Sequence, residues 1–259
     1  MNEPFPAVAE AVATGEIARL FADIREIVGV RVVNLVWRHL ATIDGALPWA
    51  WSAVKPLYLM GMPDQAALRF RQTMIVPRLA PLAGLQPAGV DDVLASYDHS
   101  NTINLFALGA LTAWLRGETS RVGTPATGQR LTAPAVVLPK LLSQEDVPLE
   151  TWALVLRLNR FGDRPQPIIL ASMYRHLAHA PLFLAQVERA LAPVQADGSL
   201  DRAIAANRSA AEGQARLLAR AIDAARPDEA ARIEAGVSAF VEHAIGKMVT
   251  ICRAIRTAR

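Results

Sequence analysis

The amino-acid sequence predicts an all-α protein made of two related halves. Apolar residues recur every three to four positions along most of the 259 residues, which is the spacing of a buried helix face. No run shows the alternation of a strand bounded by turn residues. Residues 37–41 (WRHLA) also match residues 174–178 (YRHLA), and residues 97–99 (YDH) echo residues 241–243 (VEH) in the same order. We therefore expect a duplicated helical unit.

The helices of the first half follow from apolar spacing and from helix-breaking residues. Ile17, Leu20 and Ile24 share one face after Thr14, whose hydroxyl suits a helix N-terminus. Residues 30–33 (VRVV) continue a helical pattern, so we interpret them as buried helix rather than strand. Proline and glycine interrupt the rest. Further helices are expected at about 31–42, after Pro48, after Asp64 and at about 91–115.

A stretch rich in Gly, Thr and Pro, residues 117–134, marks a loop near the middle of the chain. The expected organisation is an N-terminal repeat at 1–116, a linker at 117–146 and a C-terminal repeat at 147–259. Helices of the second half are expected from near Pro148, then at 168–178, 182–192, 199–225 and 228–256, with a break at 162–167. Two such repeats would pack about a pseudo-two-fold axis, and the buried cleft between them is the natural pocket.

Composition excludes several classes of function. The chain is 52% apolar and 20% charged, which is typical of a globular protein, and its net charge of +3 is scattered, so no nucleic-acid partner is expected. The longest apolar stretch, 103–115, is too short to span a membrane. The N-terminus lacks the pattern of a signal peptide, so we expect a cytoplasmic protein. Cys252 is the only cysteine, and no phosphate-binding loop or nucleophile elbow is present. No cofactor is expected.

Asn101 is the most informative polar residue, because it lies at helical spacing on an apolar face with Leu105 and Leu108. A buried amide without a partner costs about 1–3 kcal/mol. Two interpretations stay open: the amide points into a pocket, where it holds a water or a substrate carboxylate, or a backbone group satisfies it inside the core.

The repeated Arg-His pairs also have two interpretations. Residues 38–39 and 175–176 form a cationic lining for an anion, or they tie helix ends together in both copies. His176 and His179 have the spacing of two metal ligands, but no third ligand is near in sequence, and we expect no metal site. The acid-histidine pairs at 98–99 and 242–243 point about 100° apart on a helix and are interpreted as capping or surface groups.

Three segments resemble the group I (DehI-like) 2-haloacid dehalogenases: TGEIARLFADIREIVGVRVVNLVWRHLATIDGALPWAW (14–51), YDHSNTINLFALGAL (97–111) and ILASMYRHLAHAP (169–181). The resemblance implies an all-helical fold of two pseudo-symmetric halves that enclose a buried site, and a homodimer. It also implies hydrolysis of short 2-haloacids of either hand, in which an Asp activates a water that displaces halide directly from C2 and an Asn helps to hold that water.

Carried over position by position, the resemblance places the family's Asn at Asn101 and its pocket lining at Leu35 and Ala171, with Ser172 beside them. The family's catalytic Asp falls on Met173. A thioether cannot accept a proton near neutral pH, so another carboxylate would have to serve as the general base. The candidates are Asp98, one turn before Asn101, and Asp44 and Asp163 on loops.

Three functions follow as hypotheses. The first is a hydrolase-like protein that binds a short 2-haloacid or a similar carboxylate between its halves. The second is a non-catalytic protein that binds a small carboxylate or an apolar ligand, with Met173 filling the space of the base. The third is a different enzyme on the same scaffold that uses Asp98 or a histidine.

Overall fold

The computed structural model describes residues 6–82, 84, 87–162 and 169–259, and within these ranges it is all-helical, without a strand. The predicted fold class is therefore confirmed. The helices are α1 Gly15–Val28, α2 Leu35–Leu40, α3 Ala46–Leu59, α4 Met62–Thr73, α5 Val90–Arg116, α6 Leu149–Asn159, α7 Ser172–Leu177, α8 Pro181–Ala196, α9 Ser199–Leu218, α10 Ala230–Ala239 and α11 Gly246–Thr257. Short 3₁₀ turns lie at Glu10–Val12, Gln144–Asp146 and Ala219–Ala221, and a π-helical segment at Phe240–Ile245.

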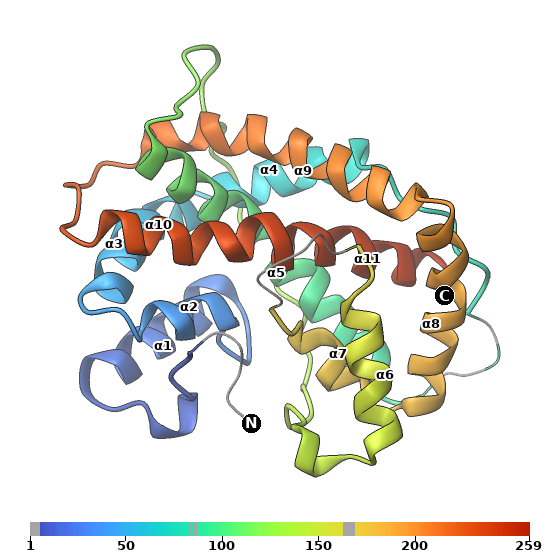
Figure 1. Cartoon of the computed structure of the whole chain (residues 1–259). Helices are drawn as coiled ribbons and strands as arrows, with labels where there is room; N and C mark the ends of the chain where they lie inside the picture. Colours follow the sequence, from blue (N-terminus) through green and yellow to red (C-terminus); the bar gives the residue numbers. More distant parts are fainter. Residues whose placement is uncertain (1–5, 83, 85–86, 163–168) are drawn as a thin grey trace.

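The long helix α5 passes through the middle of the molecule (Figure 1). Most of its 27 residues are buried, because α4, α9, α10 and α11 all pack against it. The approach of α9 is close: a Cβ added at Gly109 would lie 3.0 Å from the Cβ of Ala215. A bulkier residue at position 109 would force these two helices apart.

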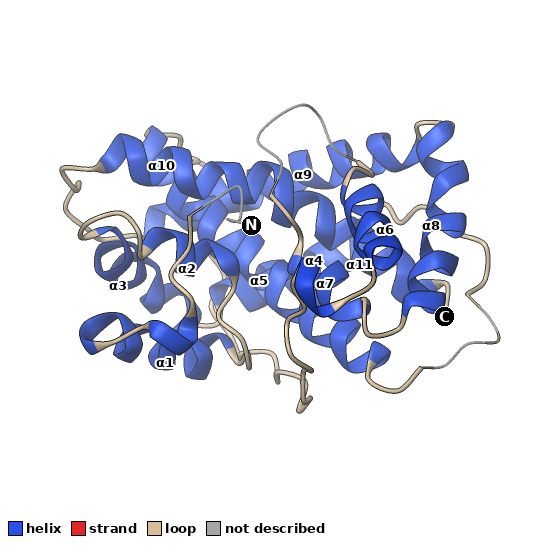
Figure 2. Cartoon of the chain, turned by 60° about the horizontal axis from the view of Figure 1, so that its bottom comes forward, coloured by secondary structure: helices blue, strands red, loops and turns tan. Residues whose placement is uncertain are grey.

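Two groups of helices flank α5. Helices α1, α2 and α3 gather on one side and α6, α7 and α8 on the other, and α5, α9, α10 and α11 lie between and behind them (Figure 2). Each side has its own hydrophobic core. The core on the α1–α3 side also takes Ala211 and Ile233 from the second half of the sequence, whereas the other core takes Val93 and Leu94 from the first. The two halves of the sequence are thus interleaved.

The segment before α2 is not helical, so the prediction of a helix over 31–42 is wrong at both ends. Gly29, at φ 73°, ends α1 in the left-handed region, which glycine adopts readily. Asn34, at ψ 144°, has a non-helical backbone, and the backbone N–H of Val33 donates to Oε1 of Glu10 at 2.8 Å. Residues 30–33 therefore form a bend between α1 and α2. Helix α7, which corresponds to α2 in the repeat, is equally short: it has six residues, whereas a helix over 168–178 was predicted.

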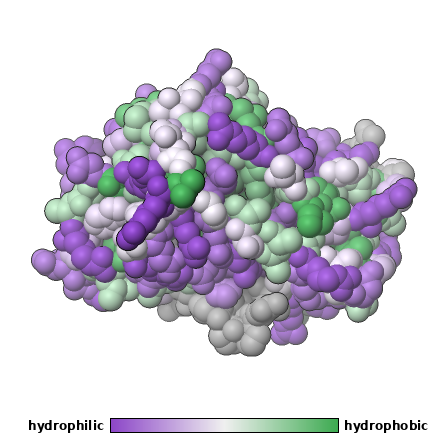
Figure 3. Space-filling model, turned by 90° about the horizontal axis from the view of Figure 1, so that it is seen from above, coloured by the Kyte–Doolittle hydropathy of each residue, from purple (hydrophilic) through white to green (hydrophobic). Residues whose placement is uncertain are grey.

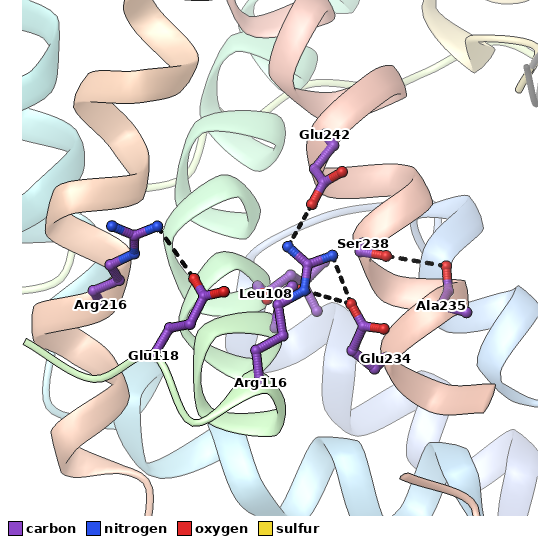
Figure 4. Close-up of polar contacts among 9 residues, drawn as sticks. Leu108, Arg116, Glu118, Arg216, Glu234, Ala235, Ser238 and Glu242 are labelled. Atoms are coloured by element: carbon purple, nitrogen blue, oxygen red, sulfur yellow. Dashed lines mark hydrogen bonds and ion pairs between the residues drawn. The ribbon is translucent and has the colours of Figure 1, made fainter. Parts of the chain in front are cut away.

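The last predicted helix, 228–256, is continuous but changes its winding. Helices α10 and α11 are joined by the π-helical segment Phe240–Ile245. Arg116, at the end of α5, holds this rod in place: its guanidinium lies 2.6 Å from Oε1 of Glu234 and 2.7 Å from Oε1 of Glu242 (Figure 4). The neighbouring Glu118 pairs with Arg216 of α9 at 3.1 Å. The predicted helix 199–225 ends early, at Leu218 and a 3₁₀ turn.

On the face that Figure 3 shows, the most hydrophobic residues lie in small separate groups among polar ones. None of the described helices combines the length and the apolar content that a bilayer crossing needs.

Candidate functional site

A pocket lies between the two cores. Its walls come from the bend before α2 and the start of α2, from α5, from the segment that leads into α7, and from the π-helical region. Its volume is about 70 Å³, whereas one water needs about 10–15 Å³. It has room for a molecule of a few heavy atoms. The described lining residues are Val30, Val32–Val36, Arg38, Ser96, Tyr97, Ser100, Asn101, Leu138, Ile169–Met173, Phe240, Ala244, Ile245 and Met248.

The two halves of the sequence contribute matching positions to this lining. Counting back from the repeated WRHLA and YRHLA segments, residues 32–36 correspond to residues 169–173, and both runs line the pocket. In α5, positions 96, 100 and 101 correspond to 240, 244 and 245 of the π-helical region, and these line it as well. The chemistry differs, because the first set is Ser, Ser and Asn and the second is Phe, Ala and Ile. The pocket thus has one polar wall and one apolar wall.

All five residues that the resemblance assigned to the site meet in this pocket. The side chains concerned are Leu35, Asn101, Ala171, Ser172 and Met173. They come from three parts of the fold: the start of α2, the middle of α5 and the start of α7. The first and the last of these are more than a hundred positions apart in the sequence. The pocket therefore brings the predicted site residues together.

Asn101 is 7% exposed, and its amide makes no hydrogen bond within the described part of the chain. Its neighbours differ in this respect: Asn104 accepts from the Tyr58 hydroxyl at 2.5 Å and donates to Oδ1 of Asn34 at 3.0 Å. The core interpretation of Asn101, in which a backbone group satisfies the amide, does not match this geometry. An unpaired, buried amide on a pocket wall is suited to hold a ligand or a water.

Arg38 is the one charged side chain among the described lining residues. Its Nε donates to the carbonyl of Val8 at 2.9 Å, while its two terminal nitrogens have no partner in the described chain. The adjacent His39 turns away and lies 2.8 Å from the carbonyl oxygen of Pro6 through Nδ1. The two interpretations of this Arg-His pair, a structural tie and a cationic lining, are thus each partly correct. The pair holds the N-terminal segment in place, and the terminal nitrogens of Arg38 stay open to a carboxylate.

The second Arg-His pair is arranged differently. Nε of Arg175 donates to the carbonyl of Leu142 at 2.7 Å, and Arg175 does not line the pocket. The Tyr97 hydroxyl lies 2.8 Å from Nδ1 of His176, which joins α5 to α7. Burial, followed by the positive charges of His179 and Arg175, lowers the pKa of His176 to about 4. Burial raises the pKa of Tyr97, against the opposing influence of Ser172, Arg175 and Arg38.

Asp98 does not reach the pocket, which corrects its nomination as a substitute base. Its carboxylate turns to the other side of α5, where Oδ2 lies 2.5 Å from Arg256, 3.4 Å from Arg71 and 3.9 Å from Arg253. Adjacent residues of a helix point about 100° apart, so Asp98 and its pocket-lining neighbour Tyr97 cannot face the same way. Asp98 and its repeat partner Glu242 both form ion pairs with arginine.

The other acidic candidates do not supply a base within the described structure. Asp44 is exposed and does not line the pocket, and Asp163 lies outside the described residues. Met173, which is 1% exposed, belongs to the core on the α6–α8 side and presents part of its surface to the pocket. None of the described lining residues is an Asp or a Glu.

The two histidines at metal-ligand spacing make other contacts. His176 contacts Tyr97, and Nε2 of His179 lies 2.8 Å from the carbonyl oxygen of Lys140. In the part of the chain that the structure describes, no three His, Cys, Asp or Glu side chains come close enough together to hold a metal ion.

Neither the protein-family models nor the curated proteins gave a match to this sequence. Solved structures did. A D-2-haloacid dehalogenase mutant superposes with a TM-score of 0.76 at 15% identity, and a D-2-haloacid dehalogenase complex with L-LA superposes with 0.74 at 14%. A mutant complex with D-2-CPA gives 0.69 at 15%. Each alignment covers 98% of this chain and 96% of the other. The chain has the D-2-haloacid dehalogenase fold.

Within this dehalogenase fold, sequence reasoning did not find the contact between Tyr97 and His176. The two residues are 79 positions apart, and no periodicity links them. A signal was nevertheless present, because Tyr97 belongs to one of the repeated segments and His176 to the other, and both repeats supply walls of the pocket.

Proposed function

We propose that this chain binds a short 2-substituted carboxylate, of the size of a 2-haloacid, in the pocket between its two cores. The observation that carries the proposal is the pairing of one cation, Arg38, with one unpaired buried amide, Asn101, on the wall of an otherwise largely apolar pocket. A pocket with a single positive charge favours a small anion over a cation or a neutral molecule.

Each part of such a ligand has a matching group. The terminal nitrogens of Arg38 form a fork that fits a carboxylate, and charge-assisted hydrogen bonds of this kind are roughly twice as strong as neutral ones. Asn101 can donate to or accept from the ligand or a water beside C2. Leu35, Ala171 and Met173 provide apolar surface for the alkyl chain and for a halogen.

Hydrolysis of the carbon–halogen bond is the second candidate function, and the dehalogenase fold favours it. The resemblance to the group I family places Met173 where the family has its base. We propose that residue 173 takes no part in activating water. Carboxylate binding, and not hydrolysis, is then the primary function that we propose for this chain. A homodimer, which the same resemblance implies, remains a prediction, and size-exclusion chromatography with light scattering tests it.

The test of binding compares D- and L-2-chloropropionate with 2-chloropropionamide, which has nearly the same shape but no charge. At ten times Kd, a ligand that binds only the folded state stabilises it by about 1.4 kcal/mol. For a chain of this length, that corresponds to a rise in melting temperature of about 3–6 °C. The acids should give this rise and the amide should not.

Two variants assign the effect to the pocket. Arg38→Gln should abolish the rise, whereas Arg31→Gln, an exposed arginine seven residues earlier, should leave it unchanged. Equal shifts with acid and amide, or an Arg38→Gln protein that responds like the wild type, would contradict the proposal.

Halide release separates binding from turnover. Wild type and Met173→Asp are incubated with both enantiomers of 2-chloropropionate, and free chloride is measured. Release by Met173→Asp but not by wild type would agree with the assignment of position 173. Release by wild type at an equal rate would show that the base lies elsewhere.

A further inference from the structure

The N-terminal segment, residues 6–13, is bound to the wall of the pocket without lining it. None of these residues belongs to the lining, yet the segment makes hydrogen bonds to two residues that do, Val33 and Arg38. Its Val8 also packs against the core on the α1–α3 side. The proposed function uses Arg38 and assigns no role to the segment that holds it.

Val8 fixes the direction of the Arg38 guanidinium. The backbone N–H of Val8 donates to the carbonyl of Arg38 at 3.0 Å, and Nε of Arg38 donates to the carbonyl of Val8 at 2.9 Å. Two hydrogen bonds thus join the same two residues. Because a guanidinium is planar, a bound Nε–H also sets the plane and the direction of the two terminal nitrogens. The segment therefore determines where the Arg38 fork points.

Glu10 connects the same segment to the bend before α2. Its Oε1 accepts from the backbone N–H of Val33 at 2.8 Å, and its Oε2 accepts from Nη1 of Arg25 in α1 at 2.5 Å. Residues 30–33 belong to no helix, so the Glu10 carboxylate takes the place of a helical hydrogen bond for Val33, which is 1% exposed. Loss of the carboxylate would leave a buried N–H without this partner on the pocket wall.

The second half of the chain repeats the tie but not its link to the pocket. Arg175, which corresponds to Arg38, donates from Nε to the carbonyl of Leu142, in the segment before α6. An arginine therefore holds the incoming segment in both halves. Arg38 lines the pocket, whereas Arg175 does not. Of the two ties, the one in the first half can pass a change in its segment on to a ligand.

We propose that residues 6–13 act as a strap whose attachment sets the affinity of the pocket for a carboxylate, with Glu10 as a positioning residue. This inference rests on the proposed carboxylate site. The attached strap keeps the Arg38 fork and the bend in the arrangement that fits the ligand, and a bound ligand in turn favours attachment. By linkage, the two effects have the same size.

Isothermal titration calorimetry with the tighter-binding enantiomer of 2-chloropropionate measures the first effect. In Glu10→Ala the dissociation constant should rise about three- to tenfold, which is the range expected for one net hydrogen bond. Glu16→Ala is the matched control, because Glu16 is an exposed acid in the first turn of α1, and it should bind like the wild type. Glu10→Gln should recover part of the loss, since its amide oxygen can still accept from Val33.

Hydrogen–deuterium exchange of the wild type measures the second effect, which a purely structural segment would not show. Saturating 2-chloropropionate should slow the exchange of residues 6–13 by about the factor that calorimetry gives for Glu10→Ala. The uncharged 2-chloropropionamide should not slow it. Exchange in the linker residues 117–127 should stay the same with either compound, because none of these residues lines the pocket.

The outcomes separate the strap from the carboxylate site. If the wild type binds 2-chloropropionate but Glu10→Ala binds it equally tightly, or if exchange in residues 6–13 does not change with the ligand, the strap is wrong while the site stands. If the wild type binds no carboxylate, the proposed function fails and the strap fails with it. If Glu10→Ala does not fold, exchange in the wild type decides the question.

Discussion

The Asp98→Asn substitution distinguishes a structural role of this carboxylate from a catalytic one. Asp98 is 5% exposed and meets three arginines, of which Arg256 and Arg253 come from α11 and Arg71 from α4. Arg71 also donates to the backbone carbonyl of Asp98 at 2.9 Å. The cluster fastens both of these helices to α5, and the substitution leaves three cations around a neutral amide.

The expected cost follows from the burial of these groups. Removal of one partner from a buried ion pair typically costs 3–5 kcal/mol. Arg253 and Arg256 are each 35% exposed, so water relieves part of the repulsion, and we expect the lower end of that range, about 3 kcal/mol. For a chain of this length, the melting temperature should fall by about 6–12 °C.

Chemical denaturation of wild type, Asp98→Asn and the control Asp91→Asn measures this cost. Asp91 lies on the same helix and pairs with Arg259, but its side chain is 77% exposed, so its loss should cost less than about 1 kcal/mol. Affinity for 2-chloropropionate should be the same in all three proteins, because neither aspartate lines the pocket. A loss of ligand affinity in Asp98→Asn, or a stability equal to that of Asp91→Asn, would refute this account of Asp98.

Two further predictions concern the α7 side of the pocket. The unfolded chain takes up a proton at His176 near pH 6.5, whereas the folded chain does so only near pH 4, so wild type should lose up to about 3 kcal/mol as the pH falls through this window. His176→Gln should lose correspondingly less between pH 7 and pH 4 in denaturant titrations, and an unchanged slope would contradict the buried neutral ring. Met173→Asp should unfold about 2–5 kcal/mol more easily, because it deletes a buried apolar side chain and buries a carboxyl group, whereas Met173→Leu should cost less than about 1.5 kcal/mol. Equal melting temperatures of the two variants would show that position 173 is open to water.

Local patterns predicted most of the helices because the interactions that decide them are near in sequence. The helix α5 runs over 90–116, within a residue of the expected 91–115 at each end, since its apolar positions recur without a break between Gly89 and Gly117. Residues 30–33 were misjudged because a distant group decides their conformation: the N–H of Val33 is bound by Glu10. Helical periodicity carries no information about such a bond.

The site was predictable only in part, for a similar reason. The repeat and the family resemblance selected positions around Asn101 and Met173, and these do share a pocket. The open fork of Arg38 and the contact between Tyr97 and His176 depend on which side chains meet after folding. The nomination of Asp98 failed because sequence proximity to Asn101 does not place two side chains on the same side of a helix.

The most direct test of the carboxylate site is a crystal structure of the protein soaked with 2-bromopropionate, with data collected at the bromine absorption edge. The account predicts a bromine peak inside the pocket between the polar and apolar walls, with the ligand carboxylate on the terminal nitrogens of Arg38 and Asn101 within hydrogen-bonding distance of the ligand or of a water beside it. An empty pocket at saturating ligand, or a carboxylate that points away from Arg38, would contradict the account.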